Sequence, residues 1–336
     1  MAEFSVASES NAADKQKIST IFRTLGAGNR PRSCSELLTE LRVSPYQDSQ
    51  NLKFESVGER DVYNIAAPFH FNGKTLLAGR VERRDSEIAE TVIFEEAGAN
   101  KWAPFFTHPS FKGLQDPCIT WAKDELILGG VRYPVPMDHG GYGCVMDFYR
   151  GASLQNLHHF LSGPRGMKDI RFKQLPDGRV AIFSRPQGAV GGRGTVGFSI
   201  APSWDAITAE MIANAPLFQG QWLPEEWGGV NEAHLLANGH LGCLGHIACF
   251  DGAGNRHYYP MVFTVDLATL QPSAIYIIAQ RSFFPPGSSK RPDLVDVVFS
   301  GGIVRNGDGT ANLYAGTSDA AAAFVKLPDP FHPFET

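Results

Sequence analysis

The chain has 336 residues, of which 43% are hydrophobic and 23 are Phe, so it can build one large core or two smaller ones. Its formal net charge of -5 excludes a strongly basic protein of the kind that binds nucleic acids. No run of 18 apolar residues occurs, and the N-terminal MAEFSVASESNAADKQ has no signal-peptide pattern. The five scattered cysteines are typical of reduced thiols, so we expect a cytoplasmic protein that binds neither nucleic acid nor membrane.

The first 50 residues differ in pattern from the rest. Residues 14–25 and 33–43 carry apolar side chains at helical spacing, and Ser33 is a favourable N-cap for the second segment. The sequence therefore predicts two short helices in an N-terminal extension, residues 1–50, ahead of a catalytic domain at 51–336.

A repeated unit of two strands joined by a tight turn fills most of the remaining chain. Its five copies are residues 64–84, 115–134, 168–188, 231–250 and 295–316. Most of the turns are Asn-Gly or Asp-Gly pairs, which supply the positive φ of hairpin turns. Each interval leaves room for two more strands, which predicts an all-β fold, a five-bladed β-propeller, with a pair of β-sandwiches as the alternative. Residues 51–58 are expected to close the ring with the last blade.

Polar residues recur where the first strand of a copy starts. Asp116, Lys168-Asp169, Asn231-Glu232 and Asp296 hold this position, and Arg80 ends a strand of the first copy. Innermost strands of a propeller surround its axis, so we expect these side chains to converge on one pocket.

The residue types in this predicted pocket suit a sugar together with an anion. The candidates are the carboxylates Asp116, Asp169, Glu232 and Asp296, the cations Arg80, Arg83, Lys168, Arg171 and Arg185, and the neutral groups His234, His246, Tyr258 and Tyr259. An inverting glycosidase needs a second carboxylate to activate water, whereas phosphate arrives already anionic. One acid beside a basic pocket therefore favours phosphorolysis over hydrolysis.

Several motifs resemble known enzymes over residues 55–325. Asp116-Pro117, SRPQG (184–188) and GRVERRDSE (79–87) resemble the inverting, five-bladed β-mannoside phosphorylases. The closer resemblance is to the mannosyltransferase-phosphorylases that build and degrade mannogen, a β-1,2-linked mannan. It rests on WGGVNEAHLL (227–236), LGHIA (244–248), HYYPMVF (257–263) and VVFSGGIVR (297–305).

The resemblance implies a role for each matching residue. Asp116 corresponds to the single catalytic acid, which would act as a base in synthesis. The expected partners are mannose oligosaccharides, phosphate or mannose 1-phosphate, and GDP-mannose as a nucleotide-linked donor, with no cofactor and no metal. Phosphate binding is expected from Lys168, Arg185, Tyr258 and Tyr259, and substrate binding from Arg80, Asp169, Asn231, Glu232, His246 and Asp296. Gln115 and Cys118 depart from the glutamate and arginine more usual beside the acid.

Other interpretations remain open at the level of sequence. A hydrolase would use Glu232 or Asp169 as its second carboxylate, and a propeller can also serve as a sugar-binding scaffold without catalysis. Asn231-Glu232 could be a buried polar pair that fixes blades four and five. His234, His240 and His246 fit core or rim positions better than a metal site.

Overall fold

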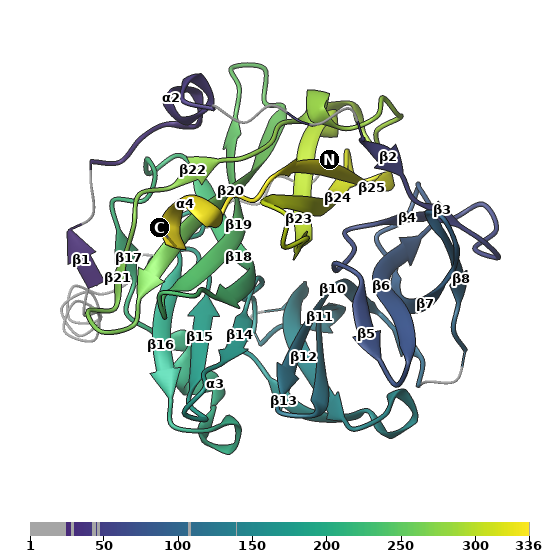
Figure 1. Cartoon of the computed structure of the whole chain (residues 1–336), viewed down its shortest axis with the longest axis horizontal. Coiled ribbons are helices and arrows are strands. Elements are labelled where there is room, and N and C mark those ends of the chain that lie inside the picture. The colour runs from purple at the N-terminus through teal and green to yellow at the C-terminus, as the bar shows by residue number, and fades with distance from the viewer. Residues whose placement is uncertain are drawn as a thin grey trace.

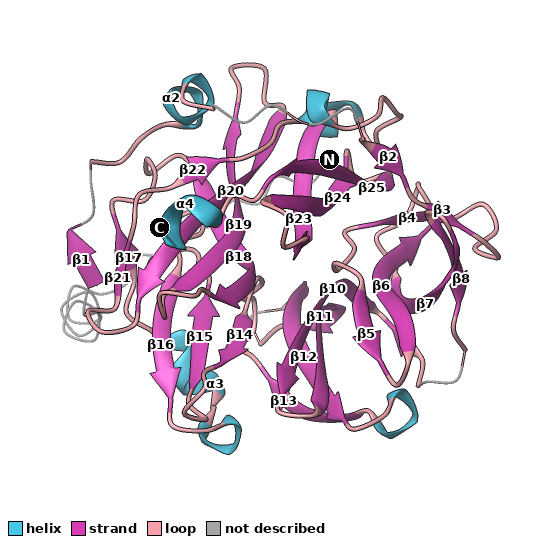
Figure 2. Ribbon diagram, in the orientation of Figure 1, coloured by secondary structure: helices cyan, strands magenta, loops and turns pink. Residues whose placement is uncertain are grey.

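Groups of strands follow one another around a central region, in the order in which they occur along the chain (Figure 1). The computed structural model describes residues 25–27, 30–41, 45, 48–106, 109–138 and 140–335. Within these residues strands dominate and the few helices are short and peripheral (Figure 2). The mostly-β class that the sequence predicts is therefore confirmed.

The predicted N-terminal helices have different outcomes. The segment 14–25 lies outside the described residues except for Leu25, which begins the short strand β1 (Leu25–Ala27) rather than ending a helix. The second segment forms α2 (Cys34–Thr39), and Ser33 is its N-cap. Glu36 completes a capping box, because its side chain accepts a hydrogen bond from the Ser33 backbone while Ser33 accepts one from the Glu36 amide.

All five predicted hairpins form. They are β5 (Phe69–Phe71) with β6 (Lys74–Glu82), β10 (Leu114–Ala122) with β11 (Glu125–Pro136), β14 (Arg171–Gln174) with β15 (Val180–Ser184), β18 (Trp227–Leu235) with β19 (Leu241–Phe250), and β23 (Asp296–Arg305) with β24 (Thr310–Thr317). Each pair is extended by one further antiparallel strand, namely β7 (Glu90–Gly98), β12 (Tyr142–Gly151), β16 (Gly197–Ala201), β20 (Arg256–Asp266) and β25 (Ala321–Pro328). The turns have the expected positive φ, for example 50° at Asn72 and 91° at Gly178.

Shorter elements complete the sheets and connections. They are β4 (Asp61–Tyr63), β8 (Lys101–Pro104), β9 (Phe111–Lys112), β13 (His158–Ser162), β17 (Phe218–Gln219), β21 (Gln271–Pro272), β22 (Tyr276–Ile277), α3 (Ala209–Ala213), α4 (His332–Glu335) and the 3-10 turns Leu154–Asn156, Trp204–Ala206, Arg281–Phe283 and Pro292–Leu294. We refer to β4–β8, β10–β13, β14–β16, β18–β20 and β23–β25 as the first to fifth strand groups. Apolar side chains pack between neighbouring groups, as Phe148 does against Phe172.

The two ends of the ring meet near residue 50. In β2 (Gln50–Asn51), Gln50 pairs with Phe324 and Asn51 with Ala323 of β25, while β3 (Lys53–Phe54) pairs with β8 of the first group. Between these strands Leu52 is buried. Of the segment predicted to close the ring, residues 51–58, only Asn51 pairs with the last group, while Lys53 and Phe54 pair with the first.

One position of the innermost strand recurs around the ring. Counted back seven or eight residues from each turn, it holds Asn64, Asp116, Asp169, Asn231 and Gly301. The strand ladder is irregular at three of these positions, and φ is positive at Asn64 (44°), Asp116 (48°) and Asp169 (54°). Asn and Asp are the side-chain-bearing residues that tolerate this conformation best.

This register corrects one expectation from the sequence. Asp296 is not the fifth equivalent of Asp116, because it lies five residues before Gly301, at the start of β23. There its backbone pairs with His257, in a parallel contact between β20 and β23. In the first group the equivalent residue is Asn64, not Arg80.

Candidate active site

A cavity of about 250 Å³ lies where the innermost strands begin. Seven residues predicted from the sequence line it: Arg80, Asp116, Lys168, Asp169, Arg185, His246 and Tyr258. Asn64, Glu87, Arg256, Arg291 and Asp319 join them. Five cations thus face four carboxylates, so the cavity can accept a further negative charge.

Asp116 is held in one orientation by two donors. Its Oδ1 accepts hydrogen bonds from Asn64 Nδ2 at 2.9 Å and from Arg80 Nη1 at 3.1 Å. Although burial opposes ionisation, the charges of Arg80 and Lys168 and the hydrogen bond from Asn64 hold the pKa of Asp116 below its ordinary value. Asp116 is therefore a carboxylate in the free protein at neutral pH.

Arg80 is itself fixed by a buried network. Its Nη2 donates to Glu82 at 2.9 Å and to Glu87 at 3.2 Å, and its guanidinium lies 5.0 Å from the centre of the Tyr63 ring. Glu82 also accepts hydrogen bonds from Tyr63 and Lys290. This network positions Arg80 against Asp116 at little entropic cost on ligand binding.

A second ionic group of the cavity comes from the third strand group, next to that of Asp116. Asp169 Oδ2 is 2.8 Å from Arg185 Nε and 3.8 Å from His246 Nε2. Burial opposes ionisation of Asp169, but Arg185, His246 and Arg171 hold its pKa below the ordinary value. Asp169 thus neutralises part of the local positive charge and fixes the Arg185 side chain, which is itself buried.

His246 and Tyr258 present polar atoms of defined character. Burial lowers the pKa of His246 to about 4, so its imidazole is neutral at pH 7. His246 Nδ1 lies 2.8 Å from the acceptor Asn231 Oδ1, which places the imidazole hydrogen on Nδ1 and leaves Nε2 as an acceptor. The hydroxyl of Tyr258 accepts from Trp227 Nε1 at 3.0 Å and keeps its own hydrogen to donate.

Lys168 provides a cation without a fixed protein partner. Among the residues that the structure describes, its Nζ makes no hydrogen bond or ion pair, yet its charge lowers the pKa of both Asp116 and Asp169. Lys168 therefore lies close enough to both carboxylates of the cavity to influence each of them. A bound anion would find this charge available.

Asp319 is a second carboxylate near Asp116. It lies in the turn between β24 and β25, and both Ser318 and Asp319 have positive φ there. Burial and the charge of Asp116 raise the pKa of Asp319 to about 6, against the opposing influence of Arg80 and Lys290. Its protonation state thus changes near physiological pH.

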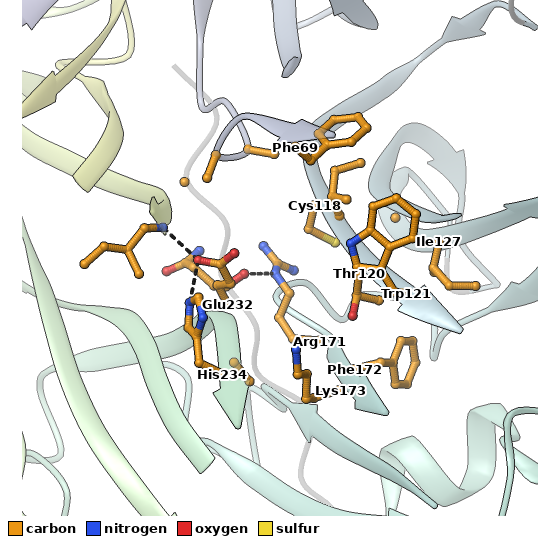
Figure 3. Close-up of a pocket in the computed structure, with 18 of the residues that line it drawn as sticks. Phe69, Cys118, Thr120, Trp121, Ile127, Arg171, Phe172, Lys173, Glu232 and His234 are labelled. Carbon is orange, nitrogen blue, oxygen red and sulfur yellow. Dashed lines mark hydrogen bonds and ion pairs between the residues drawn. The ribbon is translucent and has the colours of Figure 1, made fainter. Parts of the chain in front are cut away.

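Four residues predicted to bind ligand do not line this cavity. Asn231 lies behind His246, and it also accepts from Ser300 Oγ at 3.1 Å. Glu232 faces a different cavity, where its Oε2 accepts from the Ile303 amide at 2.7 Å (Figure 3). Asn231 and Glu232 do connect the fourth and fifth strand groups, which is the alternative role that the sequence left open for this pair.

Asp296 and Tyr259 form a separate contact. Tyr259 donates to Asp296 Oδ2 at 2.8 Å, and His257 Nδ1 lies 2.6 Å from the same oxygen. Tyr258 and Tyr259 are adjacent on β20, so their side chains point to opposite faces of the sheet, and only Tyr258 reaches the cavity.

One cluster elsewhere has the composition of a metal site. Cys34, Glu226 and Cys249 each place a ligand atom within 4.8 Å of the others, a set that could hold Zn²⁺. Both carboxylate oxygens of Glu226 already accept hydrogen bonds from backbone amides, from Cys34 at 2.6 Å and Leu223 at 3.2 Å. The expectation of a reaction without metal remains a prediction.

Comparison with protein families gives a match over most of the chain. The family described as "Protein of unknown function (DUF1861)" matches residues 40–333. No match was found among curated proteins. No helix among the described residues is long and apolar enough to cross a membrane.

Solved structures provide more specific likenesses. The chain is 36% identical to MPT-4, a mannose phosphorylase from Leishmania mexicana solved with a phosphate ion, over 90% of this chain and 93% of that one, with a TM-score of 0.81. It is 32% identical to MPT-1, a GDP-Man-dependent mannosyltransferase from the same organism, over 90% and 96% of the chains, with a TM-score of 0.80. A β-1,2-mannobiose phosphorylase from Listeria innocua, 12% identical over 85% and 94% with a TM-score of 0.53, shares the fold.

Proposed function

The chain belongs to the DUF1861 family, whose pattern spans residues 40–333, and from this premise we propose that it is an inverting β-1,2-mannosyltransferase and phosphorylase. Its relatives of known structure include a mannose phosphorylase and a GDP-Man-dependent mannosyltransferase. One observation carries the proposal: the Asp116 carboxylate, held by Asn64 and Arg80, shares a cavity of about 250 Å³ with the cations Lys168 and Arg185.

In phosphorolysis, Arg185, Lys168 and the Tyr258 hydroxyl bind phosphate beneath the anomeric carbon of a terminal mannosyl residue. A phosphate oxygen forms a bond to that carbon while the glycosidic C–O bond breaks. The proton goes from the Asp116 carboxyl to the leaving oxygen, directly or through a sugar hydroxyl. A β-mannoside thereby gives α-mannose 1-phosphate.

In synthesis, the same groups work in reverse. Mannose 1-phosphate or GDP-mannose donates the mannosyl group, and Asp116 accepts the proton of the acceptor hydroxyl. The cations stabilise the departing phosphate, because charge on its oxygens increases as the bond breaks. Asn64, Arg80 and Asp319, grouped around Asp116, bind the sugar hydroxyls.

We also propose the finer features of fold and location. The five strand groups are the blades of a five-bladed propeller, residues 51–336, and residues 1–50 are an N-terminal extension. The five cysteines are all free, which favours a reducing compartment such as the cytoplasm, where mannogen would be made and degraded.

The hydrolase alternative is less well supported. Glu232 lies in the other cavity, and Asp169 is paired with Arg185, so neither is a free carboxylate across the cavity from Asp116. The two residues that the hydrolase interpretation would use as water-activating base are therefore not available for that role.

The test is an assay of β-1,2-mannobiose with and without phosphate. We expect mannose 1-phosphate only when phosphate is present, and a loss of about 10²–10⁴-fold in kcat for Asp116→Asn. Phosphate binding by calorimetry should change less than fivefold in this variant, since Asp116 is not among the phosphate ligands. Free mannose released without phosphate would instead identify a hydrolase.

A further inference from the structure

A second, larger cavity of about 410 Å³ is lined by residues further along the innermost strands, among them Trp121 and Lys173 (Figure 3). On β10, Asp116 lines the first cavity and Trp121 the second; on β14, Arg171 to Lys173 line the second after Lys168 and Asp169 line the first. Trp121 lies five positions after Asp116 along this strand, which is roughly 15 Å. The two cavities therefore open toward opposite ends of the ring.

Arg171 separates the two cavities. It is buried, and its Nε donates to the Asn231 carbonyl at 2.8 Å while Nη1 donates to the Ile170 carbonyl at 3.0 Å. Its Nη2 lies 3.9 Å from Asp169 Oδ1 of the first cavity. Because this side chain is anchored on both sides, a ligand in one cavity does not extend into the other.

Aromatic rings form one wall of the second cavity. Phe69 and Trp121 lie on the side opposite Glu232 and His234 (Figure 3). The Trp121 ring packs edge-on near Phe69, with centroids 6.5 Å apart, and 5.5 Å from Phe71, so its orientation is set by neighbours. A fixed indole provides an apolar face against which the C–H groups of a sugar ring can pack.

Polar atoms without protein partners also line this cavity. Within the described residues, the Nζ of Lys173 and the Nε1 of Trp121 donate no hydrogen bond. Glu232 uses only Oε2, toward the Ile303 amide and His234 Nε2 at 3.0 Å, which leaves Oε1 free to accept. Burial lowers the pKa of Lys173, although the charge of Glu232 opposes this effect. The cavity thus offers hydrogen-bond donors and an acceptor that have only water to bind when no ligand is present.

The mixture of charges selects among ligand classes. A phosphate group would be drawn to Lys173 but repelled by the Glu232 carboxylate, and Arg171 already donates to two backbone carbonyls. Hydroxyl groups both donate and accept, so they can satisfy Glu232 and Lys173 together. An aromatic face with interspersed donors and acceptors therefore fits a neutral oligosaccharide better than an anion.

We propose that this cavity is a second, non-catalytic binding site for a segment of the β-1,2-mannan on which the enzyme acts. The identity of the glycan rests on the proposed function. By holding a polymer at the opposite end of the ring, the site raises the local concentration of chain ends near the active site. Short substrates gain nothing from it.

The experiment is a calorimetric titration of the full chain with β-1,2-mannotriose in the absence of phosphate, so that no phosphorolysis occurs. Two trisaccharides are expected to bind to each wild-type chain. Trp121→Ala should bind one, and Lys173→Met, which leaves the aromatic wall intact, should weaken the second site at least fivefold. Tyr142→Ala removes an aromatic ring that is 70% exposed and lines neither cavity, so it should match wild type.

A parallel assay separates this proposal from the proposed function. Trp121→Ala and Lys173→Met should convert β-1,2-mannobiose and phosphate to mannose 1-phosphate at a kcat within twofold of wild type, while KM for long mannan rises at least fivefold. If mannose 1-phosphate forms but wild type binds one trisaccharide, or both sites persist in both variants, the second site is refuted alone. If no mannose 1-phosphate forms but Trp121-dependent binding remains, the second site stands and the proposed function falls. If no trisaccharide binds and no mannose 1-phosphate forms, both are refuted.

Discussion

The ionisation of Asp116 depends on what occupies the cavity. In the free protein, Arg80 and Lys168 favour the carboxylate, which is the form that the proposed role of Asp116 as a base in synthesis would require. The proposed phosphorolysis would require the protonated form. A phosphate bound near Lys168 would offset part of the positive charge that lowers the pKa of Asp116, so the incoming nucleophile itself would make the acid easier to protonate.

Asp319 should make mannoside binding depend on pH. With its pKa raised to about 6, it is ionised above pH 6 and protonated below, and only the carboxylate can accept from two sugar hydroxyls. We expect the affinity for β-1,2-mannobiose to be constant above about pH 7 and to fall by up to tenfold per pH unit below pH 6. Omitting phosphate keeps the titration of phosphate itself out of the measurement.

The matched variant for that experiment is Asp319→Asn, which is neutral at every pH. Its affinity should be lower than that of wild type at pH 7 and nearly constant between pH 5 and 7. A wild-type affinity that does not change across pH 6 would contradict the prediction. If Asp319→Asn shows the same decline as wild type, the decline belongs to another group.

At the scale of elements, the repeated hairpin was readable from the sequence because its turns carry a local signal. Counting back from those turns locates Asp116, Asp169 and Asn231, and the same count would have found Asn64. Alignment by strand starts fails for Asp296, because the strand of the last copy begins five residues before the position equivalent to Asp116. Asp319 gave no signal, since it lies in a turn after the repeated hairpin.

The loop after β15 positions Arg185 through Gly194. A Cβ at Gly194, where φ is 146°, would lie 2.7 Å from Arg185 Nη1, so Ala at this position displaces the guanidinium. Gly194→Ala should therefore raise KM for phosphate about tenfold and lower the affinity for phosphate measured by calorimetry to the same extent.

Gly192 is the control for this substitution. It lies in the same loop with a φ of 59°, but a Cβ there would meet nothing within 4 Å. Gly192→Ala suffers the backbone strain, roughly 1–2 kcal/mol, without the displaced guanidinium. Equal losses of phosphate affinity in both variants would show that loop strain, and not the contact with Arg185, determines the effect.

At the scale of the whole molecule, the active site is a product of ring closure. Its lining residues span the chain from Asn64 to Asp319, and all five strand groups contribute. The sequence could predict this convergence from the repeats alone. It could not predict that Glu232 faces the opposite cavity, because the irregular ladder at Asn231 resets the alternation of side chains in β18.

Leu52 tests how strongly closure stabilises the fold. It lies between β2 and β3, its amide donates to the Ala322 carbonyl at 2.9 Å, and its buried side chain packs in the core cluster that contains Trp102 of the first group and Ala322 of the last. Leu52→Ala should lower the free energy of unfolding by about 2–4 kcal/mol, because it leaves a cavity at the junction. Leu235→Ala, at a site that is 38% exposed on β18, should cost less than about 1 kcal/mol. Urea unfolding of both variants measures the difference. Equal unfolding midpoints would mean that the closing strand contributes little, and that the β20–β23 pairing and the cores between strand groups hold the ring together.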